Sequence, residues 1–396
     1  MMSAVSFEKV DIIFGDSPKT ALPLLDEGKT RDEILAATGQ VLGVADATLE
    51  VEEGSICVLM GLSGSGKSTL LRAVNGLNKV TRGRVVVRAR GQKEVDVANC
   101  SGSALRQLRM NSVAMVFQQF ALLPWRTVEE NVGLGLELRG LGKAERQRVV
   151  KDKLELVGLG QWATKYAHEL SGGMQQRVGL ARAFATDADI LLMDEPFSAL
   201  DPLIRDHLQD ELLELQERLN KTIVFVSHDL DEALKLGNKI AIMEGGRIVQ
   251  AGEAEEIVLN PASDYVAEFV AHMNPLKVLR GGTLMRELAD LPREGESLLL
   301  SSESGLKVTL SAEGRPASAE KSGVPVEILA EGARAGCLPC ISPEVPMSEI
   351  IALRHSCGLP VLMVEDGKLV GVCDDEAIYG GIMRQSQGSA QKTDAA

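Results

Sequence analysis

A glycine-rich stretch at residues 61–69, Gly-Leu-Ser-Gly-Ser-Gly-Lys-Ser-Thr, constrains the fold of this chain more than any other stretch. It matches the pattern G-x-x-x-x-G-K-[S/T], in which the backbone of a loop surrounds phosphate groups. The apolar run at residues 56–60 before it predicts a buried strand, and residues 68–75 after it predict a helix. A strand, this loop and a helix in that order predict a site for a phosphate-bearing ligand.

Each residue type in the loop has a chemical reason. Glycines allow backbone conformations that a side chain forbids, so successive N–H groups can point at phosphate oxygens. Lys67 adds a positive charge for the outer phosphates, and the hydroxyl of Ser68 is placed to bind Mg²⁺ at the start of the helix. The other interpretation is a Gly/Ser turn before a core helix. The predicted phosphate-binding residues are Gly61, Ser63, Gly64, Ser65, Gly66, Lys67, Ser68 and Thr69.

Length and charge limit the classes of protein to consider. A chain of 396 residues predicts two or three domains. With 42 basic against 56 acidic residues, the formal net charge is -14, which has the wrong sign for wrapping nucleic acid or adhering to anionic lipid. No apolar run approaches the roughly 18 residues that span a bilayer, and no secretion signal begins the chain. We therefore expect a cytoplasmic protein, for which a partner would supply any membrane spans.

Six cysteines are scattered along the chain and do not suggest a disulfide framework. Cys337 and Cys340 form a close pair, but a zinc site would need a second close pair, and Cys357 and Cys373 lie far apart in apolar contexts. Two interpretations stay open: ordinary core or surface cysteines, and a redox pair at 337 and 340.

The rest of the pattern alternates strands with helices and so predicts an α/β domain with a parallel sheet. Residues 16–42 interrupt it as a helical insertion, in which Ser17-Pro18 predicts a cap and Thr30 with Glu33 predicts a capping box closed by Gly39. Strands are expected at 5–14, 47–51, 113–117, 190–193 and 222–226, and helices at 103–109, 203–219 and through much of 127–185.

Two further motifs carry chemistry. Asp194 and Glu195 end a buried strand, where one carboxylate can hold the Mg²⁺ shell and the next can accept a proton from an attacking water. Surface acids at a strand end are the other interpretation. Ser171, Gly172 and Gly173 precede a helix and form a second anion site. One nucleotide does not need two such sites, unless a second chain completes the first.

This arrangement resembles the ATP-binding cassette family over roughly residues 5–270. Residues 170–174 resemble the family's signature motif, with Met174 where the commonest form has glutamine. Residues 116–118 resemble its glutamine loop, 198–201 its D-loop and 226–228 its switch histidine, in the family's order.

The resemblance implies ATP and Mg²⁺ as ligands and assigns the roles. Glu195 would be the general base, His228 would contact the γ-phosphate, and Gln118 would complete the metal and water shell. Phe14 matches the adenine-stacking position, with a core phenylalanine as the alternative. The implied metal ligands are Ser68, Gln118 and Asp194. The implied contacts to nucleotide held by a second protomer are Ser171, Gly172, Gly173 and Asp201.

A single cassette without spans resembles the separate ATPase subunit of bacterial importers. The implied partners are a second ATPase subunit in a homodimer, an integral-membrane permease and a periplasmic or extracellular substrate-binding protein, with no nucleic acid. The implied place is the cytoplasmic face of the plasma membrane. The apolar segment 120–132 would meet the permease or, alternatively, pack in the core.

The insertion and the exact motif forms resemble the quaternary-amine uptake ATPases, which serve glycine betaine, proline betaine and choline, and among these the choline transporters' ATPases are the most alike. An importer of another osmolyte or amino acid stays open. A soluble cassette ATPase acting on ribosomes or DNA is disfavoured by the single cassette and the acidic charge.

The predicted domains are a nucleotide-binding domain at 1–275, with the insertion at about 16–42 and a helical subdomain at about 119–185. A linker or degenerate region at 276–340 follows, with strand signals at 297–300 and 306–310. Residues 341–383 resemble one cystathionine-β-synthase-type (CBS-like) repeat of small α+β character, and 384–396 are a tail. Regulation, dimer stabilisation and an evolutionary remnant stay open as roles for this C-terminal region.

Overall fold

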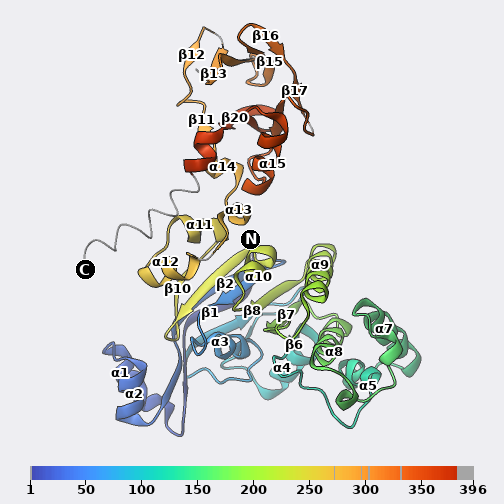
Figure 1. Ribbon diagram of the computed structural model, residues 1–396. Helices are drawn as coiled ribbons and strands as arrows, with labels where there is room; N and C mark the ends of the chain where they lie inside the picture. The colour runs from blue at the N-terminus through green and yellow to red at the C-terminus, as the bar shows by residue number, and fades with distance from the viewer. Residues whose placement is uncertain (1, 272, 296, 302–303, 331, 381–396) are drawn as a thin grey trace. The chain divides into compact units, whose positions relative to one another are not determined.

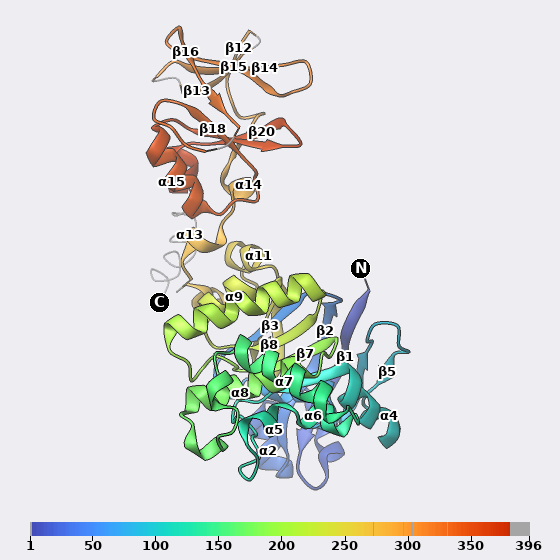
Figure 2. The same cartoon turned by 90° about the vertical axis from the view of Figure 1, so that its right-hand side faces the viewer.

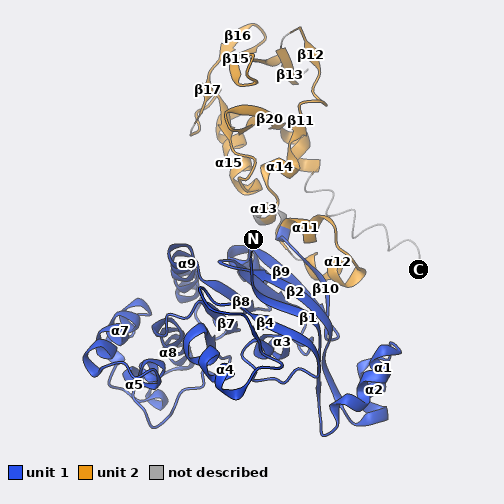
Figure 3. Cartoon of the chain, turned by 180° about the vertical axis from the view of Figure 1, so that it is seen from behind, with its two compact units in different colours: residues 1–254 blue, residues 255–396 orange. Residues whose placement is uncertain are grey.

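The structure is a computed structural model that describes residues 2–271, 273–295, 297–301, 304–330 and 332–380. The chain forms two compact units, Met1–Ala254 and Glu255–Ala396 (Figure 3). The division falls earlier than the domain boundary that we predicted at residue 275. The reason is packing, because Leu259 contacts an apolar cluster that belongs to the second unit. The predicted tail at 384–396 lies outside the described residues.

The first unit contains ten strands and fourteen helical segments among the described residues. The strands are β1 (Ser3–Phe14), β2 (Val41–Glu52), β3 (Ile56–Met60), β4 (Arg82–Val87), β5 (Val95–Asp96), β6 (Val113–Val116), β7 (Ile190–Asp194), β8 (Thr222–Val226), β9 (Lys239–Glu244) and β10 (Arg247–Gly252). The helices are η1 (Pro18–Ala21), α1 (Leu22–Asp26), α2 (Arg31–Thr38), α3 (Lys67–Val74), α4 (Gly102–Gln107), η2 (Leu108–Ser112), α5 (Val128–Val132), α6 (Leu134–Leu138), α7 (Lys143–Leu156), α8 (Gly172–Ala185), α9 (Pro202–Leu219) and α10 (Leu230–Leu236). Two short 3-10 turns, η3 (Gly160–Trp162) and η4 (Ala167–Glu169), lie between α7 and α8.

A six-stranded sheet in the order β10-β9-β3-β8-β7-β6 positions the site. Its members β9, β3, β8, β7 and β6 run parallel, and only the edge strand β10 is antiparallel. Every residue of β3, β7 and β8 is buried, as a parallel sheet covered on both faces requires. The α/β prediction is therefore confirmed, and the segments that leave the carboxyl ends of β3, β6, β7 and β8 meet at one edge.

The helix α3 lies between this sheet and a second, antiparallel sheet in the order β2-β1-β4-β5. Its apolar residues Leu70, Leu71, Ala73 and Val74 are buried in a core that draws on both sheets. Because α3 begins at the phosphate loop, the loop sits where the two sheets and this helix meet (Figure 1).

The helical insertion follows β1, as predicted, and ends at β2, which begins at Val41 and so starts earlier than the strand that we predicted at 47–51. Thr30 and Glu33 form the expected capping box, and Gly39 ends α2 in the left-handed conformation with φ of 68°. Ser17 is the N-cap residue of η1 and Pro18 is the first residue of that helix, as predicted, although the side chain of Ser17 makes no capping hydrogen bond. The backbone N–H of Ser17 instead donates to Gln40 Oε1 at 3.0 Å, which joins the two ends of the insertion. The insertion has a small core of its own, made by Ile13, Ala21, Leu25, Ile34, Leu42 and Ala45.

Helices α5 to α8 pack against one another on the side of the unit away from α1 and α2 (Figures 1 and 2). The segment that leads into them from β6 is shaped by Phe120 and Ala121, which both have positive φ. The side chain of Arg182 on α8 donates to the carbonyls of both residues and so fixes that segment.

The second unit contains two five-stranded sheets, ordered β11-β20-β19-β18-β17 and β12-β13-β14-β15-β16. The strand signals at 297–300 and 306–310 are confirmed, since β13 and β14 cover them. Residues 341–383 contain α15 followed by β19 and β20, which agrees with their expected small α+β character, and the CBS-like likeness itself stays a hypothesis. The helices of this unit are α11 (Ala254–Leu259), α12 (Asp264–Val270), α13 (Pro275–Val278), α14 (Gly281–Leu284) and α15 (Met347–Cys357). The strands are β11 (Arg286–Glu287), β12 (Arg293–Glu294), β13 (Ser297–Ser301), β14 (Leu306–Leu310), β15 (Pro316–Lys321), β16 (Val324–Val326), β17 (Ile328–Leu329), β18 (Leu338–Ile341), β19 (Val361–Glu365) and β20 (Lys368–Cys373).

All six cysteines are free thiols. Burial raises the pKa of Cys57 to about 12 and that of Cys340 to about 11, so both thiols stay protonated at neutral pH. The described residues contain no cluster of three or more His, Cys, Asp or Glu that could hold a metal ion. Among them, too, no helix is both long enough and apolar enough to cross a bilayer.

The core of the insertion generates a testable contrast between two neighbouring residues. Ile34 is fully buried, whereas the next residue, Leu35, is 46% exposed. We expect Ile34→Ala to lower the free energy of opening of the insertion by about 2 kcal/mol or more, because it leaves a cavity. Leu35→Ala should change it by less than about 0.5 kcal/mol. Hydrogen exchange of peptides from residues 16–42 measures both, and equal exchange in the two variants would contradict the packing argument.

Candidate nucleotide-binding site

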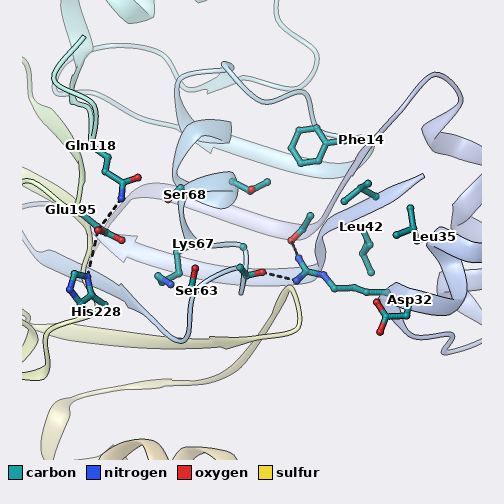
Figure 4. Close-up of a pocket in the computed structure, with 16 residues that line it drawn as sticks. Phe14, Asp32, Leu35, Leu42, Ser63, Lys67, Ser68, Gln118, Glu195 and His228 are labelled. Carbon is teal, nitrogen blue, oxygen red and sulfur yellow. Dashed lines mark hydrogen bonds and ion pairs between the residues drawn. The ribbon is translucent and has the colours of Figure 1, made fainter. Parts of the chain in front are cut away.

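A pocket of about 670 Å³ lies in the first unit, where the phosphate loop faces the insertion (Figure 4). Most of the predicted site residues come together here, although they come from β1, the loop before α3, and the segments after β6, β7 and β8. The lining residues are Phe14, Arg31, Asp32, Leu35, Val41, Leu42, Gly43, Ser63, Gly64, Gly66, Lys67, Ser68, Thr69, Gln118, Glu195 and His228.

The phosphate loop depends on glycine at positions where the backbone is close to its neighbours. Gly61 has φ of 135°, and a Cβ there would lie 2.1 Å from the carbonyl oxygen of Met243. Gly66 has φ of 103°, and its Cβ would lie 2.6 Å from the carbonyl oxygen of Gly43. Any larger residue at either position would displace backbone. These glycines let the loop lie between β2 and the end of β9.

Lys67 begins α3 and is buried in the loop. Its Nζ donates to the carbonyl oxygens of Gly61 at 2.7 Å and Leu62 at 2.8 Å. Burial lowers the pKa of Lys67, and the nearby carboxylates of Glu195 and Asp194 oppose that shift. The ammonium group is thus held inside the ring of the loop, where a phosphate oxygen can replace a carbonyl as its partner.

Asp194 is fully buried at the end of β7 and does not line the pocket itself. It accepts a hydrogen bond from Ser68 Oγ at 2.7 Å and forms an ion pair with Arg72 at 2.8 Å, both on α3. The hydroxyl, carboxylate and amide oxygens of Ser68, Asp194 and Gln118 are the hard donors that Mg²⁺ prefers. Since Mg²⁺ commonly uses one or two carboxylates together with substrate phosphates, the residues present fit this ion.

Glu195 is held between the two other predicted catalytic side chains (Figure 4). Its Oε2 accepts a hydrogen bond from Gln118 Nε2 at 3.1 Å and lies 3.5 Å from His228 Nδ1. The backbone of Glu195 has φ of 48°, which is uncommon for a residue with a side chain. Its N–H donates to the carbonyl of Val226, and its own carbonyl accepts from Gln176 Nε2. The fold therefore holds this residue in a strained conformation at the pocket, as is frequent at functional sites.

Phe14 ends β1 with 40% of its side chain exposed, which does not fit a core phenylalanine. It lies opposite Val41 in the register of β1 and β2. A Cβ at Gly43 would lie 2.7 Å from the Phe14 ring, so the absence of a side chain at 43 makes room for that ring. The ring consequently forms part of the pocket wall.

The signature-like residues and the D-loop aspartate do not line this pocket. Ser171 is the N-cap of α8, where its side chain accepts from the N–H of Met174, and it is exposed together with Gly172. Asp201 is the exposed N-cap of α9 and makes no capping hydrogen bond with its side chain. This separation is what we expect of residues that serve the nucleotide of a second protomer, and their roles stay predictions.

Six pocket residues were not predicted from the sequence: Arg31, Asp32, Leu35, Val41, Leu42 and Gly43. We treated the insertion as a helical interruption and not as part of the site. The position of Arg31 directly after the N-cap of α2 gives no indication of its partners, which are two backbone carbonyls. The available signal was that the insertion joins two strands of which one ends in Phe14.

Three comparisons with known proteins agree with this geometry. The family model described as "ABC transporter" matches residues 44–198. The glycine betaine/carnitine transport ATP-binding protein GbuA of Listeria monocytogenes is 40% identical over 406 residues, which covers 100% of each chain. The glycine betaine transport ATP-binding protein OpuAA of Bacillus subtilis is 51% identical over 71% of this chain and 66% of its own length. The glycine betaine/proline betaine protein ProV of Escherichia coli is 53% identical over 65% of this chain and 63% of its own length.

A solved structure of a dimeric ATP-binding cassette, in a post-hydrolysis state bound to ADP and Pi, matches with a TM-score of 0.54 and 28% identity. It covers 63% of this chain and 97% of that chain. The full-length similarity to a transport ATP-binding protein, the matching family model and this shared fold lead to one conclusion. The chain belongs to the ABC transporter ATPases, in the family that includes the glycine betaine and proline betaine uptake proteins.

Proposed function

We propose that this chain is the ATP-hydrolysing subunit of an importer for a quaternary amine, working on a membrane permease at the cytoplasmic face of the membrane. One observation carries the proposal: a single pocket brings together the phosphate loop, Gln118, Glu195 and His228. A phosphate-binding loop with its lysine and a carboxylate that can position or deprotonate water are parts that hydrolysis of a nucleoside triphosphate uses. The full-length relative adds the transport context.

In the proposed mechanism, the loop N–H groups and Lys67 bind the phosphates, and Ser68, Asp194 and Gln118 would hold Mg²⁺. Bound Mg²⁺ supplies positive charge that neutralises the charge developing on the phosphates. Glu195 Oε2 lies between Gln118 and His228, so a water next to it can lose its proton to this oxygen as it attacks the γ-phosphorus. The bond from the γ-phosphorus to the bridging oxygen breaks, and ADP is the leaving group. His228 then lies where its ring can contact the transferred group.

Hydrolysis in this proposal requires a homodimer, in which Ser171, Gly172, Gly173 and Asp201 of one protomer complete the site of the other. The exposed N-terminus of α8 supports this part of the proposal, because its first N–H groups can bind phosphate oxygens. A substrate-binding protein and the permease would select the transported molecule.

Glycine betaine is the substrate that we propose, with choline as the second candidate. Glycine betaine appears in the names of all three relatives above, and carnitine and proline betaine, named with it, are also quaternary amines. No residue of the ATPase site distinguishes these molecules, so the choice rests on similarity alone.

The role of Glu195 predicts a separation of binding from turnover. We expect Glu195→Gln to keep ATP affinity within about threefold and to lower the hydrolysis rate about 100-fold or more, because the amide cannot accept the proton. Equilibrium nucleotide binding and steady-state phosphate release measure the two effects. Glu217→Gln, at an exposed position of α9, is the control and should leave both unchanged. Full turnover by Glu195→Gln would remove this residue from the role of base.

The role of Ser171 predicts a defect that needs two chains. We expect Ser171→Arg to bind ATP like the unchanged protein and to lose both nucleotide-dependent dimerisation and hydrolysis. The matched control is Ser101→Arg, because Ser101 is also an exposed N-cap serine in the same unit, at the start of α4. Sedimentation measures the dimerisation, and phosphate release measures the hydrolysis. Weakened binding of ATP to the Ser171→Arg monomer would contradict a site completed in trans.

The transport function predicts ATP-dependent uptake by proteoliposomes that contain this chain, its permease and its substrate-binding protein. With ATP on the side of the membrane that carries the ATPase, we expect labelled glycine betaine to accumulate on that same side. An excess of choline should compete only weakly for this uptake. Strong competition by choline would indicate a broader quaternary-amine system. Uptake of neither compound, by an assembly that still hydrolyses ATP, would disprove the substrate class and leave the ATPase proposal standing.

A further inference from the structure

Helix α2 of the insertion forms one wall of the pocket, through Arg31, Asp32 and Leu35. The helix is held from behind by Ile34, which is fully buried in the small core of the insertion. The side chains that face the pocket are therefore carried on a fixed element.

Arg31 ties this helix to the phosphate loop. Its guanidinium donates to the carbonyl oxygen of Gly64 in the loop at 2.6 Å and to that of Gly43 in β2 at 2.7 Å. The carbonyl of Gly43 is the same group that leaves no room for a Cβ at Gly66. One side chain of the insertion thus links two backbone segments that must stay close for the loop to keep its shape.

The two ends of the pocket differ in chemistry. At one end, Lys67 and the loop N–H groups face a ligand, together with Gln118, Glu195 and His228 (Figure 4). At the other end lie three apolar side chains, Phe14, Leu35 and Val41, with exposed fractions of 40%, 46% and 51%.

Large apolar side chains that stay exposed inside one pocket indicate a ligand with an apolar or aromatic part. Asp32 adds a carboxylate at the same end, which disfavours a phosphate there and favours hydroxyl or amino groups that donate hydrogen bonds. The pairing of Phe14 with Val41 across β1 and β2 places both on one surface.

We propose that the insertion completes the base-binding end of the nucleotide pocket. The family resemblance already implies that the purine base stacks on Phe14, and the new contacts are those of Leu35 and Val41 to the base and a hydrogen bond from the base or ribose to Asp32. Arg31 is a positioning residue that holds the phosphate loop against the insertion. This inference rests on the proposed function, since it requires that the pocket binds ATP.

The test compares two ligands, MgATP and inorganic tripolyphosphate with Mg²⁺, because the second lacks a base and ribose. Leu35→Ser should weaken MgATP binding about threefold to tenfold and leave tripolyphosphate binding unchanged, since it removes an apolar contact to the base alone. Leu77→Ser is the matched control, because Leu77 is 48% exposed in the same unit and does not line this pocket. The full chain is titrated with each ligand, and the melting temperature without ligand reports on folding.

Arg31→Met should weaken the binding of both ligands by a similar factor, because it frees the phosphate loop and leaves the base contacts in place.

Val41→Ser is a second variant for the base contact, and its affinities for the two ligands should change in the same way as those of Leu35→Ser. Equal affinity of Leu35→Ser and Leu77→Ser for MgATP would overturn the base contact, as would an equal loss for both ligands in Leu35→Ser. An Arg31→Met variant that binds both ligands normally would overturn the positioning role. Failure of the unchanged protein to bind MgATP would instead overturn the proposed function itself.

Discussion

The geometry of the site depends on the contacts that the buried carboxylate of Asp194 makes with helix α3. A charge removed from water is costly unless it is paired and hydrogen-bonded, and loss of one partner of such a pair typically costs about 3–5 kcal/mol. Asp194 has both an ion pair with Arg72 and a hydrogen bond from Ser68. The two partners lie one turn apart on α3, so the end of β7 is fixed against the helix that carries the phosphate loop. Glu195, the next residue, is thereby fixed relative to the phosphate loop.

The strands of the parallel sheet explain why motifs far apart in sequence were predictable as one site. Parallel strands end at a common edge, so residues directly after β3, β6, β7 and β8 are neighbours whatever lies between them in the chain. The types of these residues follow from the chemistry that we propose for them, which is phosphate binding by Lys67 and proton transfer by Glu195. Position and residue type were thus both readable, and the pocket holds Gln118, Glu195 and His228 as expected.

Other features could not be predicted, because their partners have no signature in sequence. Arg31 bonds to two main-chain carbonyls, and any residue offers such a group. The exposed face of the eight-residue helix α2 follows from the small core around Ile34, which forms only when β1, β2 and the insertion meet. The end of the first unit at residue 254 could not be predicted either, because Leu259 packs against residues that lie far from it in the chain. The strained φ of Glu195 likewise depends on hydrogen bonds to Val226 and Gln176 from other elements.

The two ends of the pocket are therefore built on parts of the fold that differ in how much they are buried. The phosphate end is built on strands whose residues are all buried and on the Asp194 ion pair. The base end is carried by an insertion whose own core contains six buried residues and which contacts the loop through Arg31. A segment with so few buried contacts opens locally at a lower free energy than the sheet does. A ligand that touches both ends favours the closed insertion by mass action, since it binds that state more tightly than the opened one. If the insertion contacts the nucleotide as we propose, nucleotide occupancy and the order of the insertion are linked, and Arg31 is the contact through which this linkage reaches the phosphate loop.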